Sequence, residues 1–442
     1  MKQLIEKYNV SVPRYTSYPT MPFWKTEAFQ DWETNVKNAP QKRLSLYIHL
    51  PYCESLCTFC ACHKRITKNH SYEVPYIEAV LKEWKMYVEW MGERPLIEEI
   101  HLGGGTPTFF SPENLALLIK GILEWASLPD SYEFSFEGHP NNTTYEHLKV
   151  LYDLGFRRVS FGVQDYDPQV QKAIHRIQPF EAVEKVTLAA RELGYTSISH
   201  DLVFGLPFQN LEGFTETVKK TLSLNPDRLS LYSYAHVPWI KGIGQRGYSE
   251  EDLPAGEQKR TLYEMARELY EANGYYEVGM DHFAKANDKM FQAYQEGTLN
   301  RNFMGYTTTN SPLLIGLGAS AISDVWSAMA QNEKNVEEYL RMVNEGKIPV
   351  VKGHLQSEED LQRRQIIHDI MCKFRAEWPD EFWNEELERQ LEELRTDGIL
   401  QYTPTSLEVT ELGKAFIRNV CVVFDAYLRP GQALSKTFSK AI

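Results

Sequence analysis

YIHLPYCESLCTFCACHK, residues 47–64, is the stretch that decides which fold this chain can adopt. The alternating apolar residues over 44–50 are typical of a β-strand. Three cysteines follow that strand as C-x3-C-x2-C, at Cys53, Cys57 and Cys60. Because thiolates are the ligands that iron–sulfur clusters take, a loop with this spacing can wrap three of them around one corner of a cubane cluster. The motif predicts a cluster whose fourth iron lacks a cysteine and stays open to a small molecule.

Other interpretations of the cysteines have to be weighed beside the cluster. Cys62 can be a fourth ligand, a redox thiol or a bystander. Tetrahedral zinc favours paired C-x2-C knuckles, and neither a second knuckle nor a C-x2-C…H-x3-H partner follows here. A disulfide is disfavoured because nothing in the sequence indicates secretion. Four of the six cysteines also stand in this one stretch, unlike a disulfide framework.

Length and composition are ordinary for a globular protein. The 442 residues suffice for one large domain or two, and 43% of them are hydrophobic and 24% charged. The net charge of −13 argues against a nucleic-acid-binding surface, although it does not exclude a local basic pocket for an anionic substrate. The opening MKQLIEKYNVSVPRY lacks the apolar core of a signal peptide, and no run reaches the length of a membrane span. We therefore expect a cytoplasmic protein.

Strand and helix patterns alternate from residue 44 onward. Strands are predicted at 44–50, 98–102, 133–137, 158–163, 197–204, 228–234 and 275–280. Amphipathic helices are predicted between them at 72–90, 112–125, 145–154, 179–193 and 211–222. Such alternation predicts a parallel sheet with right-handed crossovers. Since no G-x-G-x-x-G opens the first unit, a full or partial TIM-like barrel fits better than a dinucleotide-binding fold.

Polar residues and glycines stand where these strands end, which is where a parallel barrel carries its functional residues. The second strand runs into three glycines at 103–105, whose missing Cβ atoms let a ligand approach the backbone, although a tight turn would use them equally. Glu137 and Gln164 end the third and fourth strands, and Asp201 lies in the fifth. The guanidinium of Arg176 can bind a carboxylate through two hydrogen bonds, or it can form a salt bridge within a helix. Glu137 can equally be a solvated residue at a strand end.

The chain divides into three predicted parts: an arm over 1–40, a catalytic barrel with lid segments over 41–350, and a covering domain over 351–442. PRYTSYPT, at 13–20, contains two prolines and should form an extended strap. Residues 240–330 are expected to close over the barrel mouth. Helices predicted at 356–374 and 379–394, then two short strands and a final helix, predict a helix–helix–wing arrangement. The acidic balance favours a covering role over DNA binding for this wing.

The cysteine stretch resembles the radical S-adenosylmethionine (SAM) signature, with Phe59 as the aromatic residue before the third cysteine. Cys62 and the preceding YIHLPYC are similar to the oxygen-independent coproporphyrinogen III oxidases (dehydrogenases) of haem biosynthesis. PRYTSYPT, GGGTP, GLGASAIS and RNVCVVFDAYLR extend the resemblance from Pro13 to about Arg429. The family usually has glycine in place of Ala61, and this chain also departs from its pattern at His139. The resemblance implies an incomplete (β/α)6 TIM-like radical SAM barrel with an N-terminal arm and a mainly helical, winged-helix-like C-terminal domain.

The resemblance also implies roles for individual residues. It implies cluster ligation by Cys53, Cys57 and Cys60 and a catalytic role for Cys62. For a first SAM molecule it implies Tyr47, Ala61, Gly104, Gly105, Thr106 and Glu137. For a second SAM molecule it implies Phe59, Gln164, Arg176, Asp201, Ala235 and Ile322. Candidates for binding an anionic tetrapyrrole, whose carboxylates need cations, are Arg14, Tyr15, His282 and Arg301, with Lys285 and Tyr306 beside them. The plain alternative for these last residues is a packed strap and lid with surface cations.

The implied activity is oxidative decarboxylation of two propionates of coproporphyrinogen III to vinyl groups, giving protoporphyrinogen IX through a 5′-deoxyadenosyl radical. The implied cofactors are one [4Fe–4S] cluster and two SAM molecules, with an electron donor and a final electron acceptor as partners. We expect a monomer without nucleic acid or a membrane span. A haem-degrading radical SAM methyltransferase and a haem-binding chaperone are the alternatives. Relatives of the chaperone kind generally lack Cys62 and the PRYTSYPT arm.

Overall fold

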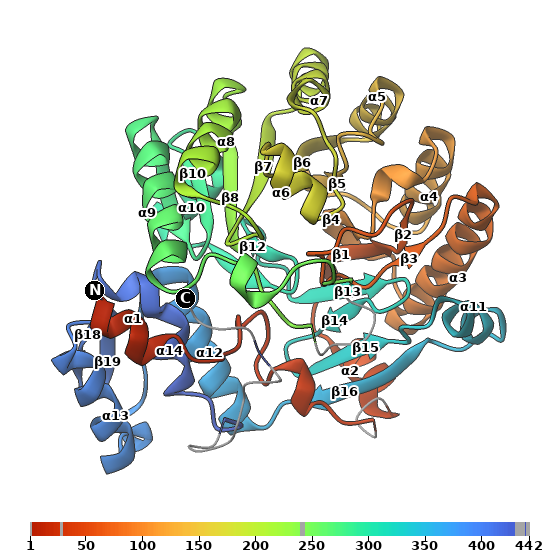
Figure 1. The fold of residues 1–442 in the computed structure, drawn as a ribbon. Coiled ribbons are helices and arrows are strands. Elements are labelled where there is room, and N and C mark those ends of the chain that lie inside the picture. Colours follow the sequence, from red (N-terminus) through yellow and green to blue (C-terminus); the bar gives the residue numbers. More distant parts are fainter. Residues whose placement is uncertain (1, 27–29, 239–243, 429–437, 439–442) are drawn as a thin grey trace.

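A mixed sheet of twelve strands, in the order β16-β15-β14-β13-β1-β4-β5-β6-β7-β8-β10-β9, forms the centre of the fold (Figure 1). The computed structural model describes residues 2–26, 30–238, 244–428 and 438. Six consecutive strands of the sheet are parallel, from β1 to β8. Their bounds are β1 Arg43–Leu50, β4 Leu96–Gly104, β5 Glu133–Gly138, β6 Phe156–Gln164, β7 Ser197–Phe204 and β8 Arg228–Ser233.

A helix follows each of these six strands and lies on the outer side of the sheet, as Figure 1 shows. These helices are α3 Glu73–Met91, α4 Pro112–Glu124, α5 Tyr145–Asp153, α7 Phe180–Leu193, α8 Leu211–Ser223 and α9 Glu257–Ala272, with the short α6 Pro168–Ala173 before α7. Side-chain caps begin several of them: Ser111 accepts a hydrogen bond from the Asn114 N–H at α4, and Thr144 forms a capping box with His147 at α5. The incomplete (β/α)6 barrel is confirmed.

The two faces of the parallel strands differ in polarity because side chains alternate along a strand. In β1, Leu44, Leu46 and Ile48 are fully buried in the core under the outer helices. The alternate residues carry polar atoms, as do their partners in the neighbouring strands, among them Glu99, His101, Glu133, Ser135, Arg158 and Ser160. The barrel therefore has an apolar outer face and a polar inner face.

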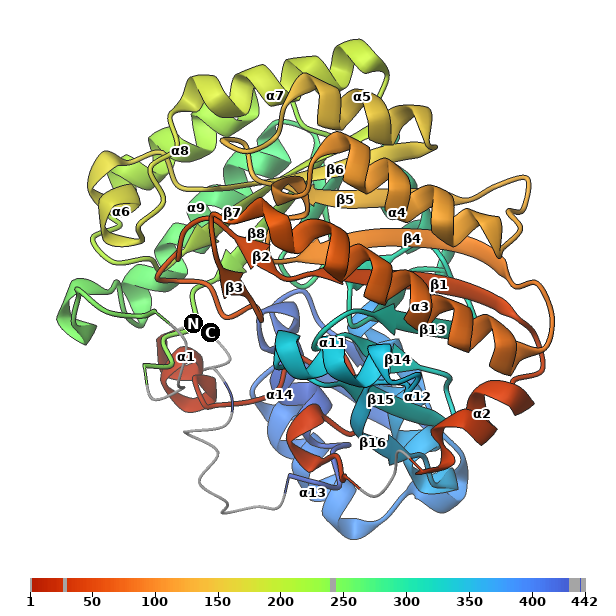
Figure 2. The same ribbon diagram turned by 90° about the vertical axis from the view of Figure 1, so that its right-hand side faces the viewer.

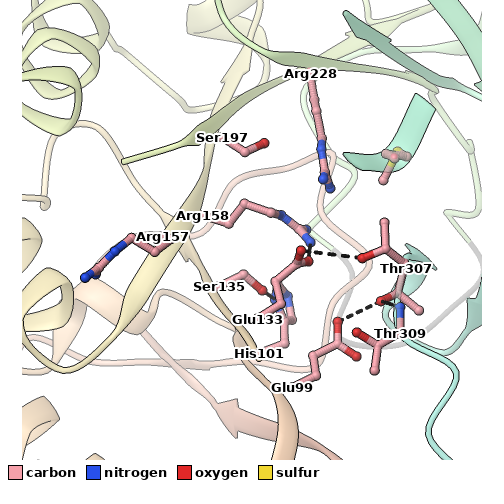
Figure 3. A network of polar contacts seen from close by, with 12 residues as sticks. Glu99, His101, Glu133, Ser135, Arg157, Arg158, Ser197, Arg228, Thr307 and Thr309 are labelled. Atoms are coloured by element: carbon pink, nitrogen blue, oxygen red, sulfur yellow. Dashed lines mark hydrogen bonds and ion pairs between the residues drawn. The ribbon is translucent and has the colours of Figure 1, made fainter. Parts of the chain in front are cut away.

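Ion pairs and hydrogen bonds fill the end of the barrel where the strands begin (Figure 3). Glu99 accepts hydrogen bonds of 2.8 Å from both Ser45 and Thr307, and Glu133 forms an ion pair with Arg158. Burial raises the pKa of Glu133, but the guanidinium of Arg158 outweighs it and lowers this pKa to about 2. A second pair, Arg228 with Asp288, lies 2.7 Å apart nearby. These contacts fill the barrel interior at this end, whereas parallel barrels carry their ligand sites at the other end, where the strands finish.

Strands from beyond residue 270 extend the sheet at both edges. β13 Leu313–Leu317 runs parallel to β1, and β14 Ile322–Asp324, β15 Ala328–Asn332 and β16 Val350–Leu355 continue antiparallel. At the other edge, β10 His282–Lys285 pairs with β8 and with β9 Tyr275–Gly279. The predicted lid over 240–330 therefore contains α9 and strands of both sheet edges. The strand at 275–280 was predicted, whereas the other strands are short and separated by polar turns, and pattern analysis did not find them. Residues 239–243 lie outside the described residues.

Two smaller elements connect these edges, α10 Lys289–Glu296 and the hairpin β11 Asn300–Asn302 with β12 Gly305–Thr307, and α11 Val336–Asn344 joins β15 to β16. Among the described residues, no helix is both long and apolar enough to cross a membrane.

The C-terminal unit follows β16 and contains helices and a three-stranded sheet, as predicted for a winged-helix-like arrangement. Its elements are α12 Glu358–Lys373, β17 Arg375–Glu377, α13 Glu385–Thr396, β18 Leu400–Thr403, β19 Ser406–Val409 and α14 Ile417–Val422. β16 continues the large sheet past the predicted boundary at residue 350. Residues 429–437 and 439–442 of the predicted domain, and with them Arg429, lie outside the described residues.

The N-terminal arm contains α1 Lys2–Tyr8, an irregular segment and α2 Trp32–Asn38. The expectation of an extended strap at 13–20 is wrong in part, because Tyr15 has φ +46° and residues 16–19 form bends. Tyr8, Tyr15 and Tyr18 are part of the apolar core of the C-terminal unit, whereas Trp32 and Val36 are part of the barrel core. Figure 2 shows α1 beside the C-terminal helices and α2 beside the sheet. The arm thus joins the two parts. The division of the chain into three domains stays a prediction.

Candidate active site

The cysteine loop leaves the C-terminal end of β1 and is held on both sides. The two-residue strand β2 Tyr52–Cys53 pairs with β3 Arg65–Ile66, which closes the base of the loop. The Thr58 N–H and hydroxyl donate to the carbonyls of Ile174 and Ala173, each at 3.0 Å. These bonds attach the loop to the segment after α6, so the thiols lie against the strand ends of the barrel.

The three thiols of the motif have different neighbours. The Sγ of Cys53 lies 3.3 Å from the Thr106 hydroxyl, and the Sγ of Cys57 lies 3.8 Å from the Arg176 guanidinium. Cys57 is buried, Cys53 and Cys60 are half-buried, and Cys62 is exposed. Burial raises the pKa of the Cys53 thiol to about 11. A hydrogen bond from the Cys62 thiol lowers the pKa of Cys60 to about 6.

The donor set of this loop fits an iron–sulfur cluster. In the part of the chain that the structure describes, no three His, Cys, Asp or Glu side chains converge on a position for a single metal ion. A four-iron cluster needs no such convergence, because each thiolate binds a different iron atom. The thiols of Cys53, Cys57 and Cys60 stand on one loop, and Cys62 lies next to Cys60 as a fourth, exposed thiol.

The glycines at 103–105 pack tightly against the end of β1. Gly104 has φ +112°, and a Cβ there would lie 2.7 Å from the His49 ring. A Cβ on Gly105 would lie 2.6 Å from the Pro51 backbone, and the Gly105 N–H donates to the Leu50 carbonyl at 2.9 Å. Gly104 and Gly105 are therefore required by the close approach of β4 to the end of β1, a reason different from the tight turn considered in the sequence. A ligand on the same backbone stays a prediction.

Glu137 lies in a chain of polar rings inside the barrel. Its carboxylate is 3.4 Å from Nε2 of His101, whose Nδ1 is 2.8 Å from the Ser135 hydroxyl. Tyr47 stacks on the His101 ring, and its hydroxyl lies 3.0 Å from Nδ1 of His49. Burial raises the pKa of Glu137, but His101 and the Gly104 N–H lower it below the ordinary value overall. Glu137 is thus a charged carboxylate at neutral pH, with 48% of its side chain exposed.

Sequence analysis missed His49 and His101, although a signal for both was present. They occupy the same alternating face of β1 and β4 as Tyr47 and Gly103. Burial lowers the pKa of His49 to about 4, so this ring is neutral at physiological pH. His139, where this chain departs from the family pattern, is also neutral at physiological pH, because burial lowers its pKa to about 2.

Gln164 and Arg176, both predicted for the second SAM molecule, lie side by side over Gly162. A Cβ on Gly162 would be 2.5 Å from the amide of Gln164 and 3.0 Å from the guanidinium of Arg176. Arg176 also donates to the Gly162 carbonyl at 2.8 Å and to the Gln178 side chain at 3.2 Å. Asp201 lies one strand away and accepts a 2.8 Å hydrogen bond from Ser160, and burial raises its pKa to about 6.

The other residues predicted for the second SAM molecule are more dispersed. Phe59 packs against a small apolar cluster that includes Tyr234, and the carbonyl of the next residue, Ala235, accepts a hydrogen bond from Gln245 at 2.8 Å. Ile322 lies in β14, beyond β13 on the other side of β1. Its carbonyl oxygen would be 2.3 Å from a Cβ on Gly316.

Three of the four substrate candidates gather beneath the strap. Arg14 forms an ion pair with Asp281, and Arg301 donates to the Arg14 carbonyl at 3.2 Å. The guanidinium of Arg301 lies over the Tyr306 ring, 4.5 Å from its centroid, and the His282 ring packs edge-on against Tyr306. The buried Nε of Arg301 has no hydrogen-bond partner among the described residues. These side chains form a cationic and aromatic group.

Tyr15 and Lys285 lie elsewhere. The Tyr15 side chain is 5% exposed and donates to Asp425 at 3.0 Å in the core of the C-terminal unit. The backbone has a positive φ of +46° at Tyr15, and Arg14 and Tyr15 face different neighbours. Lys285 binds Asn225 at the far end of β10, as expected of an ordinary surface cation.

The barrel of six parallel strands with a three-cysteine loop at the end of its first strand defines a radical SAM protein. The family model described as the radical SAM superfamily matches residues 47–221. Across the full length, the chain is similar to oxygen-independent coproporphyrinogen III oxidases, and it belongs to that family.

The oxygen-independent coproporphyrinogen III oxidase of Pseudomonas aeruginosa is 36% identical over 96% of this chain and 95% of its own. The oxygen-independent coproporphyrinogen III oxidase of Helicobacter pylori is 38% identical, and the match covers 99% of this chain and 98% of the relative. The solved coproporphyrinogen III oxidase of Escherichia coli, described as a radical SAM enzyme, superposes with a TM-score of 0.90 at 35% identity and covers 94% of this chain and 98% of its own.

Proposed function

We propose that this chain converts coproporphyrinogen III to protoporphyrinogen IX without oxygen, by oxidative decarboxylation of two propionates. The observation that supports this proposal most is the extent of the match, which spans 94–100% of this chain for the relatives named by that activity. The match includes the arm and the C-terminal unit as well as the barrel. A match over residues 47–221 alone would support only the superfamily.

Membership in the radical SAM superfamily implies one [4Fe–4S] cluster and SAM. When bound, these groups supply a reducing electron and a 5′-deoxyadenosyl radical that accepts a hydrogen atom. We assign the cluster to Cys53, Cys57 and Cys60. For the first SAM molecule we propose the glycine segment and Glu137, because a charged carboxylate at the end of the strands suits an amino group.

A second SAM molecule is proposed near Gln164, Arg176 and Asp201. Arg176 supports the proposal because its fork suits a carboxylate and it lies beside Gln164 over Gly162. Asp201 offers a carboxyl group whose pKa, raised by burial to about 6, lets it donate or accept a hydrogen bond near neutral pH.

Arg14, Arg301 and His282 are proposed to receive the tetrapyrrole. The unpartnered Nε of Arg301 supports this role, since a buried donor without an acceptor is costly until a carboxylate pairs with it. In each of two rounds, one propionate loses a hydrogen atom from its β-carbon, then carbon dioxide and one electron, and a vinyl group remains. The final electron needs an external acceptor. A monomer without nucleic acid stays the expected assembly.

Neither alternative is favoured. A haem-degrading methyltransferase and a haem-binding chaperone share the superfamily, but the full-length relatives carry the oxidase name. Cys62 and the PRYTSYPT arm are both present.

The test reconstitutes the cluster anaerobically, adds reductant, SAM and coproporphyrinogen III, and follows products by mass spectrometry. Protoporphyrinogen IX with 5′-deoxyadenosine and carbon dioxide is the expected result. Methyl transfer to haem, or deoxyadenosine without decarboxylation, would reject this substrate. No deoxyadenosine from a fully loaded cluster would reject the enzymatic proposal in favour of the chaperone.

A further inference from the structure

Tyr306 supports the guanidinium of Arg301, one of the residues proposed to receive the tetrapyrrole. The hairpin β11–β12 pairs Arg301 directly opposite Tyr306, so both side chains lie on one face of the hairpin. The guanidinium lies over the Tyr306 ring, 4.5 Å from its centroid. The face of a tyrosine ring attracts a cation, so this contact restrains the guanidinium.

Two other segments fix the Tyr306 ring in turn. Its hydroxyl donates to the Met371 carbonyl in α12 at 2.8 Å and accepts a 3.2 Å hydrogen bond from the Met280 N–H, in the turn after β9. Gly279 packs against the ring, because a Cβ there would lie 2.5 Å from it. The ring is therefore held between the hairpin, α12 and the turn after β9.

Tyr306 itself has little surface left for a substrate. It is 4% exposed, and its hydroxyl already donates one hydrogen bond and accepts another. Arg301 covers a face of its ring, and the His282 ring packs edge-on against it at 5.2 Å. An effect of Tyr306 on the substrate therefore passes through its neighbours.

Arg301 is the neighbour that still needs a partner. It is 9% exposed, and its buried Nε has no hydrogen-bond partner among the described residues. Within the same part of the chain no ion pair joins its guanidinium to a carboxylate, whereas the guanidinium of Arg14 is paired with Asp281. A buried guanidinium without a carboxylate favours an anionic ligand. The Arg14 carbonyl, at 3.2 Å, and the Tyr306 ring hold it in place.

We propose that Tyr306 is a positioning residue, whose ring holds the Arg301 guanidinium where it receives a propionate carboxylate of the tetrapyrrole substrate. This inference rests on the proposed function. A guanidinium that is already held in place loses less side-chain freedom when a carboxylate binds, so the ring strengthens binding without touching the substrate.

The alternative is a purely structural role, because Tyr306 is also part of a small apolar core cluster. A double-mutant cycle separates the two roles, since substitutions that act through one contact are not additive. The measured quantity is the Kd of coproporphyrinogen III for the anaerobic, cluster-loaded protein without reductant, from quenching of tryptophan fluorescence.

Tyr306→Leu should weaken binding about tenfold in the otherwise unchanged chain, because it removes the ring that holds the guanidinium. Arg301→Gln should weaken binding about tenfold by itself. In the Arg301→Gln chain, which has no cation for the ring to hold, Tyr306→Leu should change the Kd by less than about twofold. A structural role predicts the same factor in both chains.

Tyr195→Leu is the matched control. Tyr195 is 3% exposed in the barrel core, and its hydroxyl donates to the Leu148 carbonyl at 2.8 Å. This control should lower the free energy of unfolding as Tyr306→Leu does, but it should leave the Kd unchanged. If Tyr306→Leu fails to fold in thermal unfolding, Tyr306→Phe completes the cycle. It keeps the ring but loses the bonds that fix it, so we expect a loss of about threefold, and none in Arg301→Gln.

Two outcomes overturn the proposal: an unchanged Kd in the Tyr306 variants, or an equal loss of affinity with and without Arg301. A loss confined to the chain that retains Arg301 supports it. If this loss occurs but the wild-type protein forms no protoporphyrinogen IX when reduced with SAM, the positioning role stands and the proposed function fails. If protoporphyrinogen IX forms and the two substitutions are additive, only the positioning role fails.

Discussion

Glu137 and Asp201 are carboxyl groups of the barrel interior whose surroundings act on their pKa values in opposite directions. Burial raises both, but His101 and the Gly104 N–H lower the pKa of Glu137 overall, whereas Asp201 stays raised at about 6. Glu137 is therefore charged at neutral pH and suits an ammonium group, while Asp201 lies close to its titration. Pairs of this kind are typical of functional sites.

Asp201→Asn tests the raised pKa. The pKa of Asp201 is about 6 in the folded chain against 3.8 unfolded, so the folded state binds the proton more tightly. Its charged form destabilises the fold above pH 6, and this cost disappears as the pH falls through 6 toward 4. We expect Asp201→Asn to raise the free energy of unfolding by about 1–3 kcal/mol at pH 7.5, and by much less at pH 4.5.

Urea unfolding at the two pH values measures this difference. Asp153→Asn, at an exposed carboxylate paired with Lys149, is the control and should show no such pH dependence. Equal effects of Asp201→Asn at both pH values would contradict the raised pKa.

Gly104→Ala tests the close approach of β4 to β1. A Cβ at φ +112° meets the His49 ring at 2.7 Å, so the substitution has both a conformational and a steric cost. We expect a loss of about 2–4 kcal/mol in the free energy of unfolding. Gly92→Ala is the matched control, since Gly92 also has positive φ, +69°, but nothing lies within 4 Å of its Cβ position. It should cost about 1 kcal/mol. Equal losses would show that the His49 contact does not matter.

At the scale of elements, the strap presents adjacent residues to two different parts of the molecule. Arg14 faces Asp281 in the turn between β9 and β10, and Tyr15 faces Asp425 in the C-terminal unit. Arg418 donates to the Pro13 carbonyl at 3.0 Å, which fixes the strap between them. The backbone turns at Tyr15, where φ is +46°, so Arg14 and Tyr15 do not alternate as they would in an extended strand.

Tyr15→Phe and Arg14→Gln should therefore have different effects. Tyr15→Phe removes one buried hydrogen bond and should lower the free energy of unfolding by about 1–2 kcal/mol, with the KM for coproporphyrinogen III unchanged. Arg14→Gln should raise that KM about tenfold because it removes a cation from the proposed substrate site. Steady-state kinetics beside urea unfolding measures both. A raised KM for coproporphyrinogen III in Tyr15→Phe would show that Tyr15 belongs to the substrate site.

At the scale of the whole molecule, one loop carries all the thiols proposed for the cluster, and the other two cysteines are buried elsewhere. Burial raises the pKa of Cys372 to about 12, which keeps it a protonated core thiol, and Cys421 is fully buried in the C-terminal unit. The cluster should therefore depend on the loop alone.

Alanine at Cys53, Cys57 or Cys60 should abolish the iron and sulfide content and all 5′-deoxyadenosine formation, because each removes one cluster ligand. Cys62→Ala should keep the cluster, since we assign Cys62 no ligand role, and Cys421→Ala is the control that leaves it intact. Iron and sulfide analysis with the visible absorption spectrum measures the result. A lost cluster in Cys62→Ala would make Cys62 a ligand.

The sequence by itself determined the repeating units and the chemistry of the first loop. Strand and helix periodicity is a local property, so the positions of all six parallel strands were predictable from it, as was the class of protein from Cys53, Cys57, Cys60 and their surroundings. The winged arrangement of the C-terminal unit was predictable for the same reason.

Only the tertiary structure decided how distant segments meet. β13 pairs with β1, and β10 pairs with β8, across long stretches of chain, and no local pattern encodes these pairings. The lowered pKa of Glu137 depends on His101 in another strand, and the position of the Tyr15 side chain depends on a core built after residue 360. Long-range contacts of this kind set burial and electrostatics, and these in turn decide which of the predicted residues face the site.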